Sequence, residues 1–222
     1  KTITHAANTV PAGAPGVPNT INVAGGTYSG SETFAITFAN DYVECIGAGT
    51  STTIIDGAGA DPIIDIQATG VRIQDFTIQN GGTAIFASEG GFAIVDNTFS
   101  GSPAFDVVKA ISWVMDEEST SDRTIEDTLI SGNTFNVSCD GIYINVYLSG
   151  TNSSANVTIG DVDITNNVYQ AGPGPTPDTR EGVEMDSFSV DYLNGGILSV
   201  GTFNISNNEF YAGQHAMDLF GW

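Results

Sequence analysis

A short motif recurs along the chain, and it limits the fold more than any other feature of the sequence. The motif is isoleucine, two variable residues, asparagine, one variable residue, and then phenylalanine or tyrosine. Four copies occupy residues 94–99, 130–135, 164–169 and 205–210, and a related copy without the asparagine occupies residues 73–78. Recurrence of this kind indicates a repeat architecture, in which each unit packs against its neighbours.

The spacing of the motif indicates the length of the unit. The aromatic positions of the four copies are 36, 34 and 41 residues apart, and the related copy precedes the first one by 21 residues. The longer intervals contain stretches rich in charged residues, Gly, Ser, Asn or Pro, which are typical of loops. We therefore expect a unit of roughly 20 residues or slightly more, with loop insertions near residues 115–124, 149–157 and 171–181.

Strand periodicity runs through the rest of each unit. Apolar residues that are β-branched or aromatic alternate with polar residues, for example at 63–66, 71–73 and 142–144, which is the pattern of short strands. Gly and Asn between them provide the left-handed backbone that sharp turns need. A leucine-rich repeat has a similar period but would show regular leucines and a helical half. The pattern predicts a solenoid of short parallel strands whose coils stack about 4.8 Å apart.

The motif asparagines are expected to connect the coils. In a stacked solenoid the same turn position recurs in every coil, so side-chain amides there can hydrogen bond along the stack as a ladder. The alternative is that each asparagine serves its own turn without contacting the next. The predicted ladder consists of Asn97, Asn133, Asn167 and Asn208.

Four segments resemble the opening coils of right-handed parallel β-helix proteins, the pectin-lyase-like superfamily. They are TINVAGGTY at 20–28, VECIGAG at 43–49, TIIDG at 53–57 and VRIQDFTIQN at 71–80. The resemblance covers essentially the whole chain and implies one all-β domain, residues 1–222, with a right-handed parallel β-helix. The chain length predicts roughly seven to nine coils. The resemblance also implies a short capping helix within an N-terminal segment, residues 1–19.

Function does not follow from this resemblance. The superfamily includes lyases, glycoside hydrolases, esterases, epimerases, phage tailspikes, adhesins and surface proteins, and one fold hosts many functions.

Composition excludes two classes of partner. The chain of 222 residues has 26 Asp and Glu but 5 Lys and Arg, a formal net charge of −21. A nucleic-acid-binding protein would need a basic surface, and a membrane span would need about 20 consecutive apolar residues. The acidic, lysine-poor, Thr-, Asn- and Gly-rich composition indicates an extracellular or cell-surface protein. Glycosylation sequons start at Asn136, Asn152, Asn156 and Asn204, and Cys45 and Cys139 are expected to be free thiols packed inward.

Segments after the motif align between coils and place polar residues in columns. Residues 140–144, 181–185 and 215–219 occupy the same position, with 103–107 as a further member. Strand alternation puts Ile142, Ile144, Val183, Met185, Met217 and Leu219 inward. It puts Asp106, Tyr143, Glu184 and Asp218 outward in one column, beside a turn column of Asp140, Glu181 and His215.

Such an acidic face is a candidate ligand site. Carboxylates about 5 Å apart in neighbouring coils repel, so the face would bind calcium or hold raised pKa values. The resemblance implies calcium bridging of acidic sugars, as in related lyases, or paired carboxylates, as in related glycoside hydrolases. The alternative is a set of solvated acidic positions. The catalytic candidates are Asp140, Glu181, Glu184, Asp186, Arg180 and His215, and the ligand or metal candidates are Asp106, Asp140, Tyr143, Glu184 and Asp218.

The missing cations argue against catalysis. A lyase of this kind needs an Arg or Lys base beside the carboxylates, and the nearby cations are Arg180 and Lys109. The leading interpretation is therefore a non-catalytic structural or adhesive protein. The apolar end of the chain, with Phe220 and Trp222 as contact candidates, suggests head-to-tail association with copies of itself into filaments. For this end of the chain, the alternative is a domain cut from a longer protein, without its cap. The alternative is a lyase or glycoside hydrolase that acts on acidic polysaccharide, with calcium as its cofactor.

Overall fold

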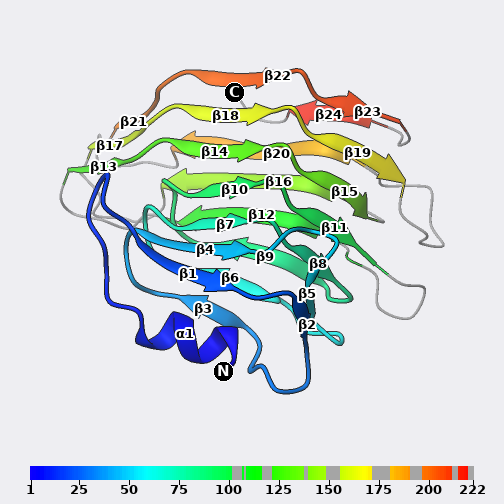
Figure 1. Cartoon of the computed structure of the whole chain (residues 1–222). Coiled ribbons are helices and arrows are strands. Elements are labelled where there is room, and N and C mark those ends of the chain that lie inside the picture. The colour runs from blue at the N-terminus through cyan, green and yellow to red at the C-terminus, as the bar shows by residue number, and fades with distance from the viewer. Residues whose placement is uncertain are drawn as a thin grey trace.

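The computed structural model is a right-handed parallel β-helix with one short helix near its N-terminus (Figure 1). It describes residues 1–101, 107, 109–116, 122–137, 140–148, 156–171, 181–190, 197–211 and 215–219, and for 116, 147–148, 171, 181–182, 184–190 and 215–219 the description is of the backbone. Three long sheets have seven strands each, so the described residues form seven coils. The predicted all-β solenoid of seven to nine coils is confirmed.

Each coil contributes one strand to each long sheet. The first sheet contains β1 (Asn19–Val23), β4 (Val43–Gly47), β7 (Arg72–Gln74), β10 (Ala93–Val95), β14 (Thr128–Ser131), β18 (Val162–Thr165) and β22 (Phe203–Ser206). The second contains β2 (Gly26–Tyr28), β5 (Thr53–Asp56), β8 (Thr77–Gln79), β11 (Thr98–Ser100), β15 (Thr134–Val137), β19 (Val168–Ala171) and β23 (Glu209–Phe210). The third contains β3 (Ile36–Phe38), β6 (Ile64–Ile66), β9 (Thr83–Ala87), β12 (Lys109–Asp116), β16 (Asp140–Leu148), β20 (Glu181–Val190) and β24 (His215–Leu219).

The spacing of the sequence motif is the spacing of the coils. Phe99 pairs in register with Ile78 on one side and with Phe135 on the other, and the series continues through Tyr169 to Phe210. Hydrogen bonds between equivalent positions accordingly join residues 21 apart in the short coil, and 36, 34 and 41 apart in the longer ones.

The long coils use part of their extra residues to build a fourth sheet. Its strands are β13 (Arg123–Ile125), β17 (Asn156–Ile159) and β21 (Ile197–Val200), and they also pair in parallel. The expected insertions overlap the ends of strands, because β12 continues to Asp116, β17 begins at Asn156 and β20 begins at Glu181. Residues 117–121, 149–155 and 172–180 lie outside the described part of the chain.

Strand alternation builds the interior. In β16 the side chains of Ile142, Ile144 and Val146 are 0% exposed, whereas Tyr143 and Asn145 between them are partly exposed. Fully burying an aliphatic side chain of this size contributes about 1.5–3 kcal/mol. The inward prediction holds for Ile142, Ile144 and Val183; Met185, Met217 and Leu219 lie outside the described side chains.

The four motif asparagines form a continuous ladder between the first and second sheets. Asn97 donates its backbone N–H to Oδ1 of Asn133 at 3.0 Å, Asn133 donates in the same way to Asn167 at 3.0 Å, and Asn167 donates to Asn208 at 2.9 Å. The side-chain amide nitrogens repeat the contact at 3.3, 3.1 and 3.0 Å. The alternative of independent turn residues does not describe this arrangement.

Aromatic rings stack beside the ladder. Phe99, Phe135, Tyr169 and Phe210 follow one another with ring centroids 5.1, 4.7 and 4.6 Å apart and nearly parallel planes. Side-chain ladders or stacks stabilise sheets that remain flat over many strands. The ladder and the stack therefore keep the longer coils in register.

Helix α1 (Ile3–Thr9) covers the first coil. Ile3 and Ala7 point into the core and are 2% and 3% exposed. Glu32 accepts the backbone N–H groups of Ile3 and Thr4, each at 2.8 Å, and so satisfies donors at the helix N-terminus. The capping helix expected from the resemblance is therefore present.

The last coil is less covered than the one before it. Phe203 and Ile205 in β22 are partly buried, whereas their register partners in β18 are 0% exposed. Phe210 is 37% exposed and its partner Tyr169 only 4%. The predicted end contacts, Phe220 and Trp222, lie outside the described residues.

Candidate functional site

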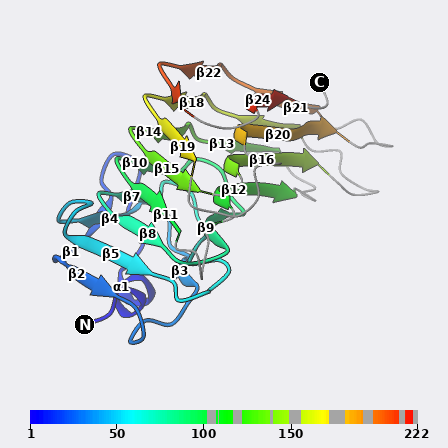
Figure 2. The same ribbon diagram turned by 90° about the vertical axis from the view of Figure 1, so that its right-hand side faces the viewer.

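The strands of the third sheet lengthen from β3 to β20, before the short last strand β24 (Figure 2). Its strands are 3 residues long in β3 and β6, 5 in β9, and then 8, 9 and 10 in β12, β16 and β20. A wide sheet presents more outward side chains per coil than the narrow sheets do. Strands β12, β16 and β20 are the longest strands in the described part of the chain.

Strand register defines a column of side chains on this outer face. Thr37 pairs with Asp65, Asp65 with Phe86, Phe86 with Ser112, and Ser112 with Tyr143. The column then continues, through backbone positions, to Glu184 and Asp218. The predicted alignment of Tyr143, Glu184 and Asp218 is thus the observed register.

The placement of Asp106 in this column is wrong. Ser112, not Asp106, pairs with Tyr143, and Asp106 itself lies outside the described residues. The reason is that Ile111 and Trp113, both 0% exposed, provide the inward residues that match Ile142 and Ile144 in the next coil. Burial of these side chains shifts the strand toward the C-terminus, relative to the apolar segment at 103–107.

Lys109 joins the turn column. It pairs in register with Asp140, and its Nζ lies 3.9 Å from the Asp140 carboxylate. The same Nζ lies 3.5 Å from the centre of the Tyr143 ring, which is a cation–π contact. Asn145 donates from Nδ2 to the Tyr143 hydroxyl at 3.3 Å. We call Lys109, Asp140, Tyr143 and Asn145 the lysine–tyrosine cluster.

The lysine–tyrosine cluster is partly open to solvent. The Lys109 side chain is 32% exposed and the Asp140 side chain 10%, while Tyr143 and Asn145 are partly exposed. An ion pair at this depth is shielded from water more than a surface pair. The cluster therefore presents an aromatic ring, an amide, a carboxylate and an ammonium group to a ligand on one surface.

Sequence reasoning missed Phe86. This aromatic residue is partly exposed on the outer face, two strands from Tyr143, with Ser112 between them. Ser112 is 6% exposed and small, and it lies between the two aromatic positions in the column. Strand alternation in the sequence could have revealed Phe86, because this residue lies between two inward residues. No motif asparagine belongs to its strand.

For most of the other predicted site residues, the structure describes the strand but not the side chain. Glu181 pairs with His215 through the backbone, as the predicted turn column requires. The side chains of Glu181, Glu184, Asp186, His215 and Asp218 belong to the undescribed set, and Arg180 lies outside the described residues.

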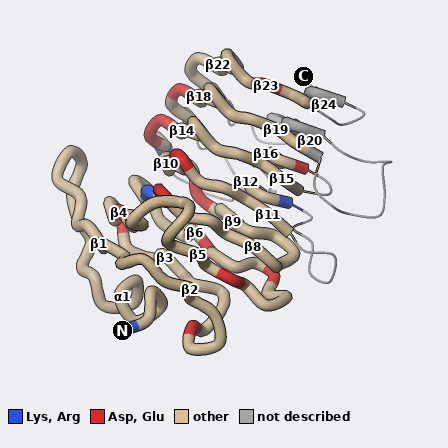
Figure 3. Tube along the Cα trace, turned by 45° about the vertical axis from the view of Figure 1, so that its right-hand side comes forward, with Lys and Arg blue, Asp and Glu red and all other residues tan. Residues whose placement is uncertain are grey.

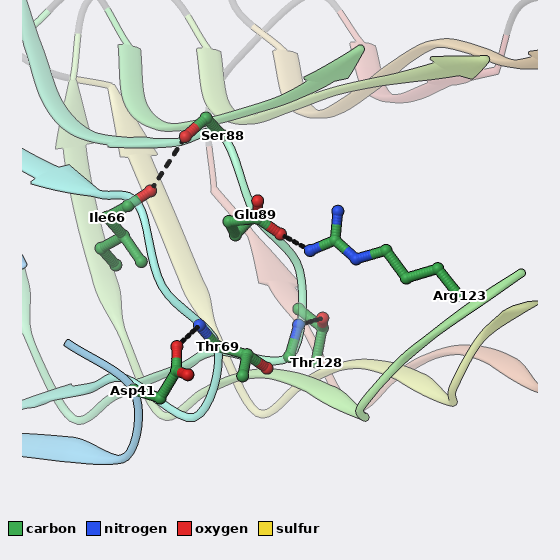
Figure 4. Close-up of polar contacts among 8 residues, drawn as sticks. Asp41, Ile66, Thr69, Ser88, Glu89, Arg123 and Thr128 are labelled. Carbon is green, nitrogen blue, oxygen red and sulfur yellow. Dashed lines mark hydrogen bonds and ion pairs between the residues drawn. The ribbon is translucent and has the colours of Figure 1, made fainter. Parts of the chain in front are cut away.

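Among the described residues, the remaining arginines have polar partners within the protein. Arg123 forms an ion pair with Glu89 near the end of β13 (Figure 4). Arg72 donates from Nε to Gln74 at 2.7 Å, and it lies beside Glu44 in the first sheet. Acidic positions far outnumber basic ones along the described chain (Figure 3).

Several carboxylates have structural roles at the turns. Asp41 accepts the backbone N–H of Thr69 at 3.2 Å, a contact that Figure 4 shows beside the Arg123 ion pair. Asp127 accepts the N–H of Asp161 at 2.9 Å, and Asp161 accepts that of Thr202 at 2.6 Å. Some of the carboxylates therefore link one coil to the next through hydrogen bonds.

Calcium has no site among the side chains that the structure describes. No group of three or more His, Cys, Asp or Glu residues there is arranged to hold a metal. The carboxylate of Asp140, a member of the predicted turn column, lies 3.9 Å from the ammonium group of Lys109. The described side chains therefore do not fit a calcium ion.

The predicted modification positions have varied surroundings. Asn136 is partly exposed in β15, and Asn156 is exposed at the start of β17. Asn204 donates its side-chain amide to Asp163 at 2.9 Å, and Asn152 lies outside the described residues. Cys45 is 1% exposed and free, as predicted for an inward-packed thiol.

No protein-family model matches the sequence, and no curated protein does either. Among solved structures, a PL6 alginate lyase in complex with a trisaccharide superimposes with a TM-score of 0.41 at 10% identity, over 93% of this chain and 56% of that one. A pectin methylesterase from carrot gives a TM-score of 0.38 at 11% identity, over 88% and 79% of the two chains. ORF18 of Geobacillus virus E2 gives 0.27 at 14% identity, over 98% and 58%.

These similarities are too low to carry an argument about activity. The fold rests on the strand pairing itself, which is the parallel β-helix that the sequence resemblance implies. The chain spans 56% of the length of the alginate lyase. In the described part of the chain, no helix has the length and apolarity of a membrane span.

Proposed function

We propose that this protein is an extracellular or cell-surface β-helix that binds a polysaccharide on the outer face of its third sheet, in a structural or adhesive role. The observation that carries this proposal is the lysine–tyrosine cluster on the widest strands of the solenoid. Tyr143 lies in the outward column of that face, with Lys109 above its ring at 3.5 Å and Asn145 at its hydroxyl.

The chemistry of this face suits sugars. A tyrosine combines an apolar ring with a polar hydroxyl, and a sugar ring likewise has apolar faces and hydroxylated edges. Amide and carboxylate groups at Asn145 and Asp140 add the hydrogen-bonding partners that fix a ligand's orientation. An extended sheet face also matches an extended polymer, because successive coils repeat the same surface about every 4.8 Å.

Isothermal titration against a panel of oligosaccharides tests this proposal. Tyr143→Ala should weaken binding of whichever glycan binds by about tenfold or more, as expected for removal of a buried aromatic contact. Tyr211→Ala is the matched control, because Tyr211 is 68% exposed at the end of β23, outside the third sheet. Equal loss in both variants, or binding unaffected by Tyr143→Ala, would refute this location.

A second candidate function is a polysaccharide lyase or glycoside hydrolase on the same face. The structure favours it in one respect, since it brings a lysine amine within 3.9 Å of a predicted carboxylate candidate. A lyase releases an unsaturated product that absorbs near 235 nm, and a hydrolase releases reducing ends. Activity of either kind that is lost in Lys109→Gln or Asp140→Ala would replace the adhesive assignment.

Head-to-tail filaments receive no support from the N-terminal end. Helix α1 packs against β1 and β3, so a neighbouring molecule's last coil would meet this helix rather than open strands. The apolar residues of β22 are the described part of the opposite end. Electron microscopy of the purified chain tests association directly.

A further inference from the structure

Acidic residues far outnumber basic ones in the strands of the third sheet. Within its strands the sequence places one lysine, Lys109, and no arginine. The same strands contain seven acidic residues, which are Asp65, Asp116, Asp140, Glu181, Glu184, Asp186 and Asp218.

Lys109 is committed to partners within the protein. Its Nζ lies 3.9 Å from the Asp140 carboxylate and 3.5 Å from the Tyr143 ring centre. A carboxylate of a ligand would have to displace Asp140 or share the ammonium group with it. The cluster therefore uses its cation to hold Tyr143 in place, and the pair as a whole has no net charge.

The arginines that the structure describes do not offset the negative charge of the third sheet. Arg123 is paired with Glu89, and Arg72 lies in the first sheet, beside Glu44. A negative ligand on the outer face of the third sheet would instead have Asp65 in the same column and Glu184 on the strand next to Tyr143. One like charge at about 5 Å in water weakens binding roughly fourfold, and a second one about fourfold again.

The uncharged residues of the column suit a neutral ligand. Phe86 and Tyr143 are separated by two strand spacings, about 9.6 Å, with the buried Ser112 between them. Two aromatic rings on one face, with a small residue between them, provide apolar contact for two separated sugar rings. Neither contact gains from a negative charge on the ligand.

We infer that the outer face of the third sheet selects an uncharged glycan over a uronic or sulfated one, with Phe86 and Tyr143 as its two contact points. This inference rests on the proposed function, because it concerns the same face. Selection comes from repulsion by the acidic column, while Lys109 and Asp140 act as positioning residues for Tyr143.

Titration of the whole chain with two glycan classes tests the inference. The neutral probes are cellohexaose, xylohexaose and mannohexaose, and the acidic probes are hexagalacturonate and hexamannuronate, all in EDTA at 10 mM and 150 mM salt. We expect one of the neutral probes to bind at least about tenfold more tightly than either acidic probe at low salt. The difference should shrink at high salt, because the Debye length falls from about 30 Å to about 8 Å.

Variants separate the two contact points from the charge. Phe86→Ala should weaken the neutral probe about tenfold, whereas Gln170→Ala, an exposed position on the second sheet, should leave it unchanged. An acidic probe that binds most tightly at low salt and is weakened by Lys109→Gln would overturn the inference and leave the proposed function standing. Failure of both probe classes to bind would overturn both.

Discussion

The asparagine ladder should be the most sensitive part of the fold, and Asn133→Ala tests it. Asn133 is 0% exposed. Its Nδ2 donates to the carbonyl of Ile94 at 2.8 Å and to Asn167 at 3.1 Å, and its Oδ1 accepts the N–H of Asn97 at 3.0 Å. Alanine would leave that N–H and that carbonyl buried without partners.

The size of the effect follows from those two groups. A buried polar group without a partner costs about 1–3 kcal/mol, so the two groups predict that Asn133→Ala lowers the free energy of unfolding by about 2–6 kcal/mol. Asn136→Ala is the matched control, because it removes a partly exposed amide from the next strand of the same coil. Its effect should stay within about 0.5 kcal/mol.

Urea unfolding followed by Trp113 fluorescence measures both variants. Trp113 is 0% exposed and packs edge to face on Phe92, so its emission reports the loss of the core. An Asn133→Ala variant whose unfolding free energy lies within about 1 kcal/mol of the control would show that the ladder does not stabilise the stack.

Three further predictions concern single groups. Glu32→Gln should lower the unfolding free energy by about 1–2 kcal/mol and speed amide exchange in α1, because Glu32 accepts two helix N–H groups; Glu44→Gln is the control, and equal exchange in both would contradict the cap. The hydrogen bond from the Tyr42 hydroxyl to Glu126 raises the pKa of Tyr42 to about 12. Since the folded state holds this proton more tightly, its stabilising effect is complete below pH 10 and is lost as the pH rises through 12. Glu126→Gln should therefore bring the phenol titration, read at 295 nm, back toward 10, and an unchanged titration would refute the contact. Burial raises the pKa of the Cys45 thiol to about 12, so in a Cys139→Ser background Cys45 should react with Ellman's reagent at pH 8 only after unfolding; rapid reaction of the folded protein would contradict its burial.

The fold was predictable because single recurring residues in the sequence mark the register of its coils. Motif asparagines and aromatic residues recur at the same place in each coil, so their spacing gives the coil lengths directly. The same logic predicted Tyr143, Glu184 and Asp218 in one column.

The error at Asp106 arose although a complete motif, at residues 94–99, precedes β12. The coil before β12 contains an insertion, so the apolar segment at 103–107 resembled the strand that Ile111 and Trp113 actually form. Phe86 was overlooked although it lies between Ile85 and Ala87, both 0% exposed, so that strand alternation alone places it outward.

Contacts between distant coils were out of reach of sequence reasoning. Glu32 caps a helix 28 and 29 residues earlier, and Tyr42 meets Glu126 at a separation of 84 residues. Neither pair has a motif, because each depends on how turns from different coils come together. The Lys109 contact with Tyr143 is similar: both residues were visible, but their distance required the register of β12 on β16.

In-register stacking of the coils is the basis of both the fold and the proposed binding face, and a disulfide test addresses it most directly. Thr98 and Thr134 are register partners on the outer face of the second sheet, where neighbouring strands lie about 4.8 Å apart. In a Cys139→Ser background, the pair Thr98→Cys and Thr134→Cys should oxidise to a disulfide, because that separation lies within the range of about 4.4–6.8 Å between Cα atoms. The offset pair Thr98→Cys and Asn136→Cys should oxidise far less. Preferential crosslinking of the offset pair would contradict the stacking that this account requires.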